Sequence, residues 1–309
     1  MSKTAFLFPG QGSQYQGMGK LLAQQYQSAR LTFEEADQAL GFELSRLCFE
    51  GPEEELKKTE NTQPALLTVS IAALRVLKDA GYAPDVVAGH SLGEYSALVT
   101  AGSLSFTEAL QLVNKRGRYM QEAVPAGGAM AALLKVPEGT LDKILAEAAA
   151  GQVVSAANLN SPDQVVIAGH AAAVKRAMDL AKAAGAKRAV LLAVSAPFHC
   201  RLMQPAQERL RADLERVHFS DLAVPLITNW NAQAITTGRE AMEGLYQQVP
   251  NPVYWTDSIR AIAAMGVKRF IEVGAGGVLT ALCRQIEPAL TGAKFGEPGD
   301  LEKVAHVFA

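Results

Sequence analysis

The sequence has no surplus of positive charge and no long apolar run. Its 309 residues carry a formal net charge of -2, whereas proteins that bind nucleic acid or anionic lipid present clusters of Lys and Arg. No stretch approaches the roughly 20 uncharged apolar residues that a membrane-spanning helix requires. We therefore expect a soluble protein that acts neither on nucleic acid nor at a membrane, and whose partners are small molecules or individual proteins.

Cysteine is scarce, and its spacing forms no motif. The three cysteines are Cys48, Cys200 and Cys283, an odd number without a C-x-x-C pair, which argues against a disulfide framework and a structural zinc site. The apolar segment at residues 4–8 ends at Pro9 and is too short for a secretory signal peptide. These features favour a cytoplasmic location.

The glycine-rich segments do not complete a nucleotide-binding motif. The segment "GQGSQYQGMG" has Tyr15 where G-x-G-x-x-G needs its third glycine, and "GAGGVL" has Leu279 at that place. Neither the phosphate-binding G-x-x-x-x-G-K-[ST] nor the zinc-binding H-E-x-x-H occurs. We expect no metal and no bound cofactor.

Short apolar runs alternate with helical patterns along most of the chain. Strands separated by helices favour a parallel sheet covered by helices, and a chain of this length can bury a large core. Pro64 is expected near the first turn of its helix, where proline is tolerated. The expected strands are 4–8, 86–88, 224–229 and 269–273, and the expected helices include 19–39, 63–80, 92–101, 106–122 and 254–265.

The segment 125–195 has a different order of elements. Apolar runs at 130–136, 153–158, 164–169 and 188–194 enclose helical patterns at 140–150 and 171–184. This β-α-β-β-α-β order is typical of a ferredoxin-like unit. The sequence therefore predicts an α/β protein with a hydrolase-like parallel-sheet core at 1–124 and 196–309, and a small ferredoxin-like domain inserted at 125–195.

The segment "GHSLG" at 89–93 fits G-x-S-x-G, the turn that presents a nucleophilic serine between a strand and a helix. A serine hydroxyl needs a base within hydrogen-bond reach and donors for the oxyanion that forms when it attacks a carbonyl. The Leu92 N–H is placed to be one such donor. The alternative is that Ser91 only caps the following helix.

His199 is the candidate base, because it follows a strand-like run and the other histidines are adjacent to Ser91, exposed or terminal. A lone histidine can equally be structural. Arg116 lies on the apolar side of a helix that opens with the capping box Ser105-x-x-Glu108. A planar guanidinium there can bind a carboxylate with two parallel hydrogen bonds, or it can pair with a nearby Asp or Glu.

Eight segments are distributed in order along nearly the whole chain. They are "FPGQGSQ" (8–14), "NTQPAL" (61–66), "GHSLGEYSAL" (89–98), "RGRYMQEA" (116–123), "NLNSPDQVVIAG" (158–169), "PFH" (197–199), "NPVYW" (251–255) and "EVGAGGVL" (272–279). Together they resemble the malonyl-CoA:acyl carrier protein transacylases of fatty acid synthesis. Two positions depart from that family's pattern, Ala275 for a common proline and Cys200 for a usual serine, and we expect both to alter packing and not chemistry.

The resemblance implies a ping-pong transfer of malonyl from malonyl-CoA to the phosphopantetheine thiol of acyl carrier protein, for fatty acid or polyketide elongation. Malonyl-CoA and the phosphopantetheine-bearing carrier protein are both substrates, so no cofactor is implied. We expect a monomer. The implied roles are Ser91 as nucleophile, His199 as base, Arg116 as the malonyl clamp, Gln11 and Leu92 as backbone oxyanion donors, and the Gln248 carbonyl as the group that orients His199. Gln63 and Asn160 are expected to line the pocket, and Leu92 and Phe198 are the choices associated with malonyl selectivity.

Two other classes of protein remain open on the residues alone. A serine esterase or thioesterase shares G-x-S-x-G, but usually has an Asp or Glu between serine and histidine to orient the histidine. Here Asp163 and Asp179 lie in that interval, within the expected insertion. A non-catalytic docking module with the same fold is the third possibility, and it would never carry an acyl group on Ser91.

Overall fold

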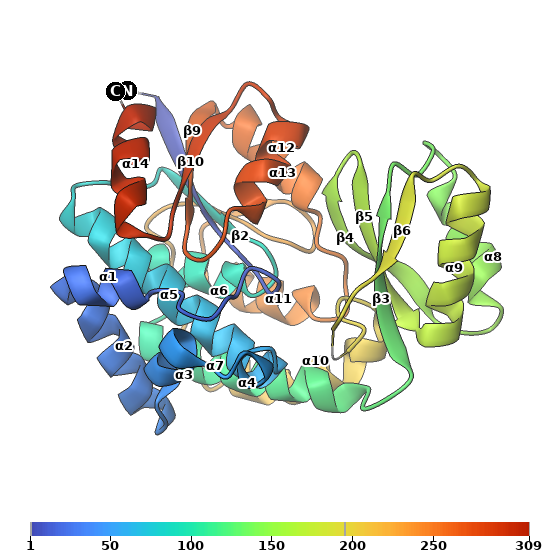
Figure 1. The fold of residues 1–309 in the computed structure, drawn as a ribbon, viewed down its shortest axis with the longest axis horizontal. Helices are drawn as coiled ribbons and strands as arrows, with labels where there is room; N and C mark the ends of the chain where they lie inside the picture. The colour runs from blue at the N-terminus through green and yellow to red at the C-terminus, as the bar shows by residue number, and fades with distance from the viewer. Residues whose placement is uncertain (1, 195, 309) are drawn as a thin grey trace.

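The molecule consists of two unequal α/β parts lying side by side, as Figure 1 shows. This computed structural model describes residues 2–194 and 196–308. The larger part is built on a six-stranded sheet and the smaller on a four-stranded sheet. The predicted fold class is confirmed, whereas the domain limits stay a prediction, and the limit at Ser195 falls outside the described residues.

The large sheet has the strand order β10-β9-β1-β2-β7-β8. All neighbouring strands are parallel except β7 and β8, which pair antiparallel at one edge. The strand expected at 224–229 shortens to two residues. The strands are β1 (Lys3–Phe8), β2 (Val86–Gly89), β7 (Leu226–Ile227), β8 (Ala234–Ile235), β9 (Val267–Val273) and β10 (Thr291–Phe295).

Both faces of this sheet are covered by helices, which explains why its strands are continuous apolar runs. Successive side chains of a strand point to opposite faces. Ala5 and Leu7 join one core with helices α12 and α13, while Phe6 and Phe8 join the other with helices α5, α6 and α7. The helices are α1 (Lys20–Gln25), α2 (Gln27–Leu40), α3 (Leu44–Glu50), α4 (Glu53–Leu56), α5 (Thr59–Asp79), α6 (Gly93–Thr100), α7 (Phe106–Ala123), α10 (Gln204–Leu214), α11 (Gly238–Gln248), α12 (Trp255–Ala264), α13 (Val278–Ile286) and α14 (Leu301–Phe308).

Two helical expectations need correction. The helix expected at 19–39 is two helices, because the backbone of Tyr26 is extended between α1 and α2. Helix α5 begins at Thr59, so Pro64 lies inside the helix and not in its first turn. The sequence analysis did not identify α11. The capping box of Ser105 and Glu108 is present as expected. None of the helices in residues 2–194 and 196–308 is long and apolar enough to span a membrane.

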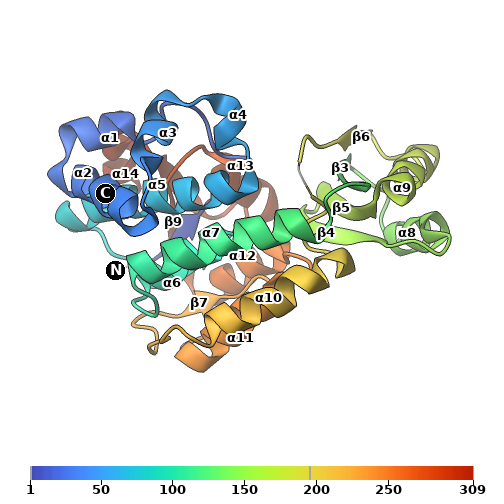
Figure 2. The same ribbon diagram turned by 90° about the horizontal axis from the view of Figure 1, so that it is seen from below.

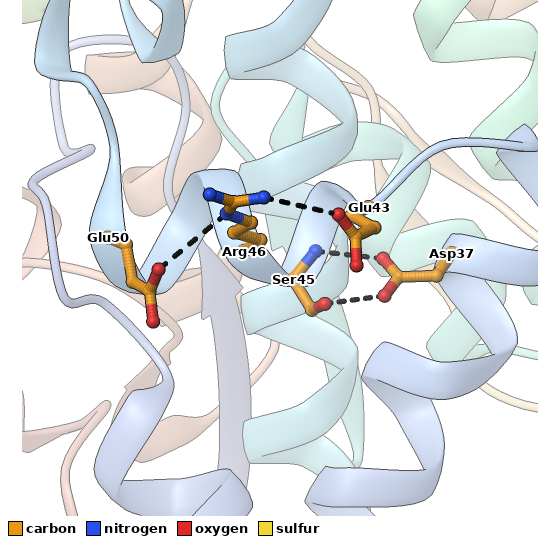
Figure 3. Close-up of polar contacts among 5 residues, drawn as sticks. All are labelled: Asp37, Glu43, Ser45, Arg46 and Glu50. Carbon is orange, nitrogen blue, oxygen red and sulfur yellow. Dashed lines mark hydrogen bonds and ion pairs between the residues drawn. The ribbon is translucent and has the colours of Figure 1, made fainter.

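Helix α3 is fixed to α2 by one carboxylate (Figure 3). Asp37, near the end of α2, accepts hydrogen bonds from the backbone N–H and the hydroxyl of Ser45, the N–H at 2.8 Å. Arg46 lies along the exposed side of α3 between Glu43 and Glu50, at 3.6 and 3.7 Å. Exposed pairs of this kind contribute at most about 1 kcal/mol, so α3 is held mainly by the Asp37 bonds and by Leu44 and Cys48, which are buried in the main core.

The small part has the order β-α-β-β-α-β and an antiparallel sheet in which the strands lie β4-β5-β3-β6. This is the ferredoxin-like arrangement expected from the sequence. One face packs on its two helices through residues such as Leu133 and Ile167. The elements are β3 (Gly128–Leu134), α8 (Leu141–Ala149), β4 (Val154–Ser161), β5 (Gln164–His170), α9 (Ala171–Ala183) and β6 (Arg188–Leu191).

The opposite face of the small sheet is turned toward the large part. Met130, Ala132 and Val166 on this face belong to the main core. Figure 2 shows α7 and α10 side by side, with the small part at their far ends. Main-chain hydrogen bonds join β4 to Val253, just before α12. The small sheet is therefore held over the large part, and the hollow described below lies between them.

Pro64 leaves a gap in the hydrogen bonding of α5 that a neighbouring helix fills. Proline has no N–H, so the Glu60 carbonyl one turn earlier loses its helical donor. The side chain of Asn114 on α7 donates to this carbonyl at 3.1 Å. The bond ties α5 to α7, the helices that carry Gln63 and Arg116.

We expect Asn114→Ala to lower the free energy of unfolding by about 1 kcal/mol, because the Glu60 carbonyl then has no protein donor. The same change should cost less in a Pro64→Ala background, where the restored N–H supplies the helical bond. Urea denaturation of the two single variants and the double variant measures this coupling. Equal costs in both backgrounds would contradict the assignment.

Candidate active site

Ser91 occupies a tight turn between β2 and α6. Its backbone φ of 51° lies in the left-handed region, which non-glycine residues rarely adopt outside functional sites. The glycines on either side permit the turn. A Cβ on Gly89 would lie 1.9 Å from the Gly93 carbonyl carbon, and one on Gly93 would lie 2.0 Å from the Phe8 oxygen. The G-x-S-x-G spacing therefore follows from close backbone contacts.

Two amide side chains hold this turn from segments distant in sequence. Asn229, just after β7, accepts a bond from the Ser91 N–H at 2.6 Å and donates to the Gly89 carbonyl at 2.6 Å. The Gln248 side chain donates to the Ser91 carbonyl at 2.9 Å. The sequence analysis missed Asn229, although its place at the end of an expected strand was a signal, since sites gather at the carboxyl ends of parallel strands.

Ser91 and His199 are within hydrogen-bond reach of each other. The Ser91 Oγ lies 2.7 Å from His199 Nε2, and His199 Nδ1 lies 3.0 Å from the Gln248 carbonyl oxygen. A carbonyl only accepts, so Nδ1 carries the proton and Nε2 is free to accept the proton of the serine. The sequence analysis expected this carbonyl near His199. No Asp or Glu among the described residues bonds to the ring.

Arg116 is buried next to Ser91 without a carboxylate partner. Its side chain is 1% exposed. Its Nη1 donates to Gln63 Oε1 at 2.8 Å, and its Nη2 donates to Gln248 Oε1 at 2.8 Å and to Ser91 Oγ at 3.2 Å. Within the described part of the chain it makes no ion pair, and its Nε has no partner. The alternative of a structural pair with Asp or Glu is therefore wrong.

These groups open onto a hollow of about 100 Å³ between the two parts of the molecule. Asn160 is not among its lining residues. It lies in an adjoining hollow, where its Oδ1 is 2.8 Å from His90 Nε2. The lining residues are Gln11, Gln63, His90, Ser91, Leu92, Arg116, Met120, Met130, Asn158, Leu192, Val194, Phe198 and His199.

The N–H groups of Gln11 and Leu92 lie at the edge of this hollow without an acceptor among the described residues. Free N–H groups beside a nucleophile are what an oxyanion hole requires. The described residues contain no cluster of His, Cys, Asp or Glu that could hold a metal. The site therefore offers a nucleophile, a base, two N–H donors and an unpaired guanidinium.

The amino-acid sequence is similar to one family of known proteins. The profile of the acyl transferase domain matches residues 5–290. The malonyl CoA-acyl carrier protein transacylase of Escherichia coli (strain K12) is 50% identical over 300 residues, which are 96% of this chain and 97% of that protein. The chain belongs to this acyltransferase family.

Solved structures of family members superpose closely on the chain. The transacylase of Coxiella burnetii has a TM-score of 0.97 and 43% identity, covering 100% of this chain and 98% of that one. A malonyl-transacylase solved in complex with a type II PKS acyl carrier protein has a TM-score of 0.96 and 46% identity, covering 99% of both chains. The chain is thus an acyltransferase, as the sequence analysis expected.

The imidazole of His199 is held in its neutral form. Burial is the main cause that lowers the pKa of His199, and the nearby positive charge of Arg116 adds to it, so that the pKa falls to about 3. A free histidine has a pKa of about 6.5. A lowered pKa keeps Nε2 unprotonated as the pH falls, so this nitrogen can still accept a proton well below about pH 6.5.

We expect Ser91 to react with an uncharged fluorophosphonate at a rate that stays level from about pH 8 down to about pH 5, because His199 is not protonated in that range. Arg116→Ala should move the acidic loss of reactivity to higher pH, since one of the two causes that lower the His199 pKa is removed. Labelling kinetics followed by mass spectrometry measure both.

The control for this experiment is Arg118→Ala, which removes an exposed arginine from the same helix. Its profile should match that of the wild type. A wild-type profile that falls with a midpoint near pH 6.5 would contradict the neutral, desolvated base. Circular dichroism at each pH confirms that the protein is folded.

Proposed function

We propose that this acyltransferase moves malonyl from malonyl-CoA to the phosphopantetheine thiol of an acyl carrier protein through a malonyl-Ser91 intermediate. The names of its relatives support this substrate pair, and so does the relative solved with its carrier protein. The reaction supplies fatty acid or polyketide chain elongation. We further propose that the protein is monomeric, cytoplasmic and free of bound cofactors.

The first half of the reaction is acylation of Ser91. The Ser91 Oγ attacks the thioester carbon while its proton passes to His199 Nε2, 2.7 Å away. The negative charge that develops on the carbonyl oxygen is stabilised by the N–H groups of Gln11 and Leu92. Collapse of this intermediate breaks the carbon–sulfur bond, and His199 returns the proton to the departing CoA thiolate.

The second half repeats these steps with a different thiol. The phosphopantetheine thiol of the carrier protein gives its proton to His199 and attacks the malonyl ester. The carbon–oxygen bond to Ser91 breaks, and Ser91 regains the proton. The Gln248 carbonyl holds the histidine in the required tautomer throughout. One histidine thus serves as base and acid in both halves.

The single observation that carries the malonyl assignment is the buried, carboxylate-free guanidinium of Arg116 beside the nucleophile. Burying a charge without a partner is costly, and a substrate carboxylate offers the missing partner. The malonyl carboxylate would take two parallel hydrogen bonds from Arg116, displacing those to the Gln63 and Gln248 side chains. Gln63, Leu92 and Phe198 then border the acyl group, and Asn160 acts from the second layer by fixing His90.

The orientation of His199 also bears on the esterase alternative. Hydrolases with G-x-S-x-G generally orient the histidine with an Asp or Glu, whereas here a main-chain carbonyl does so. Asp163, one of the acids weighed above, forms an exposed pair with Lys135 in the small part. These contacts favour transfer over hydrolysis.

We expect Arg116→Ala to lower kcat/KM for malonyl-CoA by about 100-fold or more, because charge-assisted hydrogen bonds to the malonyl carboxylate are lost. Acetyl transfer, which needs no clamp, should be unchanged or faster. Transfer assays with radiolabelled malonyl-CoA and acetyl-CoA measure both, with Arg118→Ala as the matched control. Equal losses for the two substrates would contradict the clamp.

We expect malonyl to appear on a holo carrier protein much faster than free malonate appears in solution. Without the carrier, one malonyl group per enzyme should remain on Ser91, and Ser91→Ala should carry none. Intact-protein mass spectrometry and malonate quantification test this. Rapid hydrolysis that the carrier does not affect would instead support an esterase, and an unlabelled wild type would support a docking module.

A further inference from the structure

Glu94 is a buried carboxyl group that the proposed reaction steps do not use. It lies in the first turn of α6, three residues after Ser91, and is 1% exposed. Its Oε2 accepts a bond from the Asn229 N–H at 3.0 Å and from the Gln248 side-chain amide at 2.8 Å. Both donors belong to residues that hold the Ser91 turn, so Glu94 is separated from that turn by one layer of hydrogen bonds.

A single amide separates Glu94 from the Arg116 guanidinium. Arg116 Nη2 donates to Gln248 Oε1, and Gln248 Nε2 donates to Glu94 Oε2, both at 2.8 Å. The two opposite charges therefore interact through the Gln248 carboxamide without direct contact. Among the described residues no carboxylate contacts the guanidinium directly, so a ligand carboxylate could replace its bonds to the amide oxygens of Gln63 and Gln248.

The surroundings of Glu94 favour a change of charge on this carboxyl group. Among the described residues, Arg116 on α7 is the charged side chain that faces it and Tyr95 on α6 is a second titratable group. Gly244 on α11 lies close to it, since a Cβ there would be 3.4 Å from Glu94 Oε1. No donor among the described residues bonds to Oε1, so a proton can be held there. Burial is the main cause that raises the pKa of Glu94, to about 7, against the opposing effects of Gln248, Asn229 and Arg116.

We propose that Glu94 is a positioning residue that is ionised in the free enzyme as the indirect counter-charge of Arg116, and that takes up a proton from water when a carboxylated acyl group binds Arg116. The inference rests on the proposed function. A malonyl carboxylate brings a second negative charge to the same desolvated guanidinium. Protonation of Glu94 removes the negative charge that was already there. The malonyl carboxylate then replaces the Glu94 carboxylate as the counter-charge of Arg116, and the buried net charge is unchanged.

The direction of the pH dependence follows from this exchange. Below the pKa of Glu94 in the free enzyme the group is already neutral, so malonyl binds without repulsion. Above it, binding either requires proton uptake or places two negative charges close together. Since kcat/KM reports ionisations of the free enzyme, its value for malonyl-CoA should fall as the pH rises through about 7. Acetyl-CoA carries the same CoA phosphates but no acyl carboxylate, and should show no such fall.

The experiment is a pH profile of Ser91 acylation by malonyl-CoA and acetyl-CoA in single-turnover conditions. For the wild type we expect the malonyl-to-acetyl ratio of kcat/KM to fall about five- to tenfold between about pH 6 and about pH 9. In Glu94→Gln, which resembles the protonated form, the ratio should stay level and the high-pH malonyl rate should rise. If Glu94 had a purely structural role, Glu94→Gln would lower kcat/KM for both substrates at every pH.

The matched control is Glu272→Gln. Glu272 is also a fully buried carboxyl whose oxygens accept two backbone N–H bonds, but it lies in β9, and its donors are Leu279 and Thr280 in the first turn of α13. In this variant the malonyl-to-acetyl ratio of kcat/KM should fall with pH as it does in the wild type. A malonyl-to-acetyl ratio that still falls with pH in Glu94→Gln overturns the inference. A wild-type ratio that stays level overturns it too, and that measurement does not depend on a variant that folds. A wild type that never acylates Ser91 with malonyl would overturn the proposed function itself.

Discussion

A positive charge buried without a carboxylate partner is the constraint around which the site is arranged. Removing a guanidinium from water is costly unless its donors are matched, and Arg116 is matched by the amide oxygens of Gln63 and Gln248 and by the hydroxyl of Ser91. Three helices, α5, α7 and α11, must therefore meet at one point. The site tolerates this charge because neutral oxygens accept its hydrogen bonds. A substrate carboxylate could replace these oxygens as the acceptor.

Gln248 links this charge to the rest of the catalytic machinery. Its side chain contacts Arg116, Glu94 and the Ser91 carbonyl, while its main-chain oxygen holds His199. One residue thus holds the Arg116 guanidinium, the Ser91 turn and the tautomer of His199. Ser91 and His199 both have positive φ values, of 51° and 58°, and such strained backbone persists only where the surroundings hold it in place.

The environment that fixes these groups also sets their proton affinities. The same burial lowers the pKa of His199 and raises that of Glu94, because in both cases it disfavours the charged form. A neutral His199 and a Glu94 carboxyl with a pKa of about 7 are therefore both consequences of burial around the Ser91 turn. The small sheet contributes by covering that hollow with Met130 and with the segment after β6.

Local features of this protein could be predicted from the sequence, and long-range ones could not. The G-x-S-x-G turn and the capping box of α7 depend on residues within a few positions of one another, so their spacing alone determined them. The β-α-β-β-α-β order could be predicted because each of its elements has its own local hydrophobic pattern. The residues alone made His199 a candidate base and Arg116 a candidate carboxylate ligand, and the resemblance to a family added the malonyl role of Arg116 and the Gln248 carbonyl. Only the tertiary structure decided that Asn229 holds the turn, that Asn160 binds His90, and that Glu94 reaches Arg116 through an amide. These contacts join segments up to 154 positions apart, and a hydrogen bond between distant segments leaves no periodic signal in a single sequence.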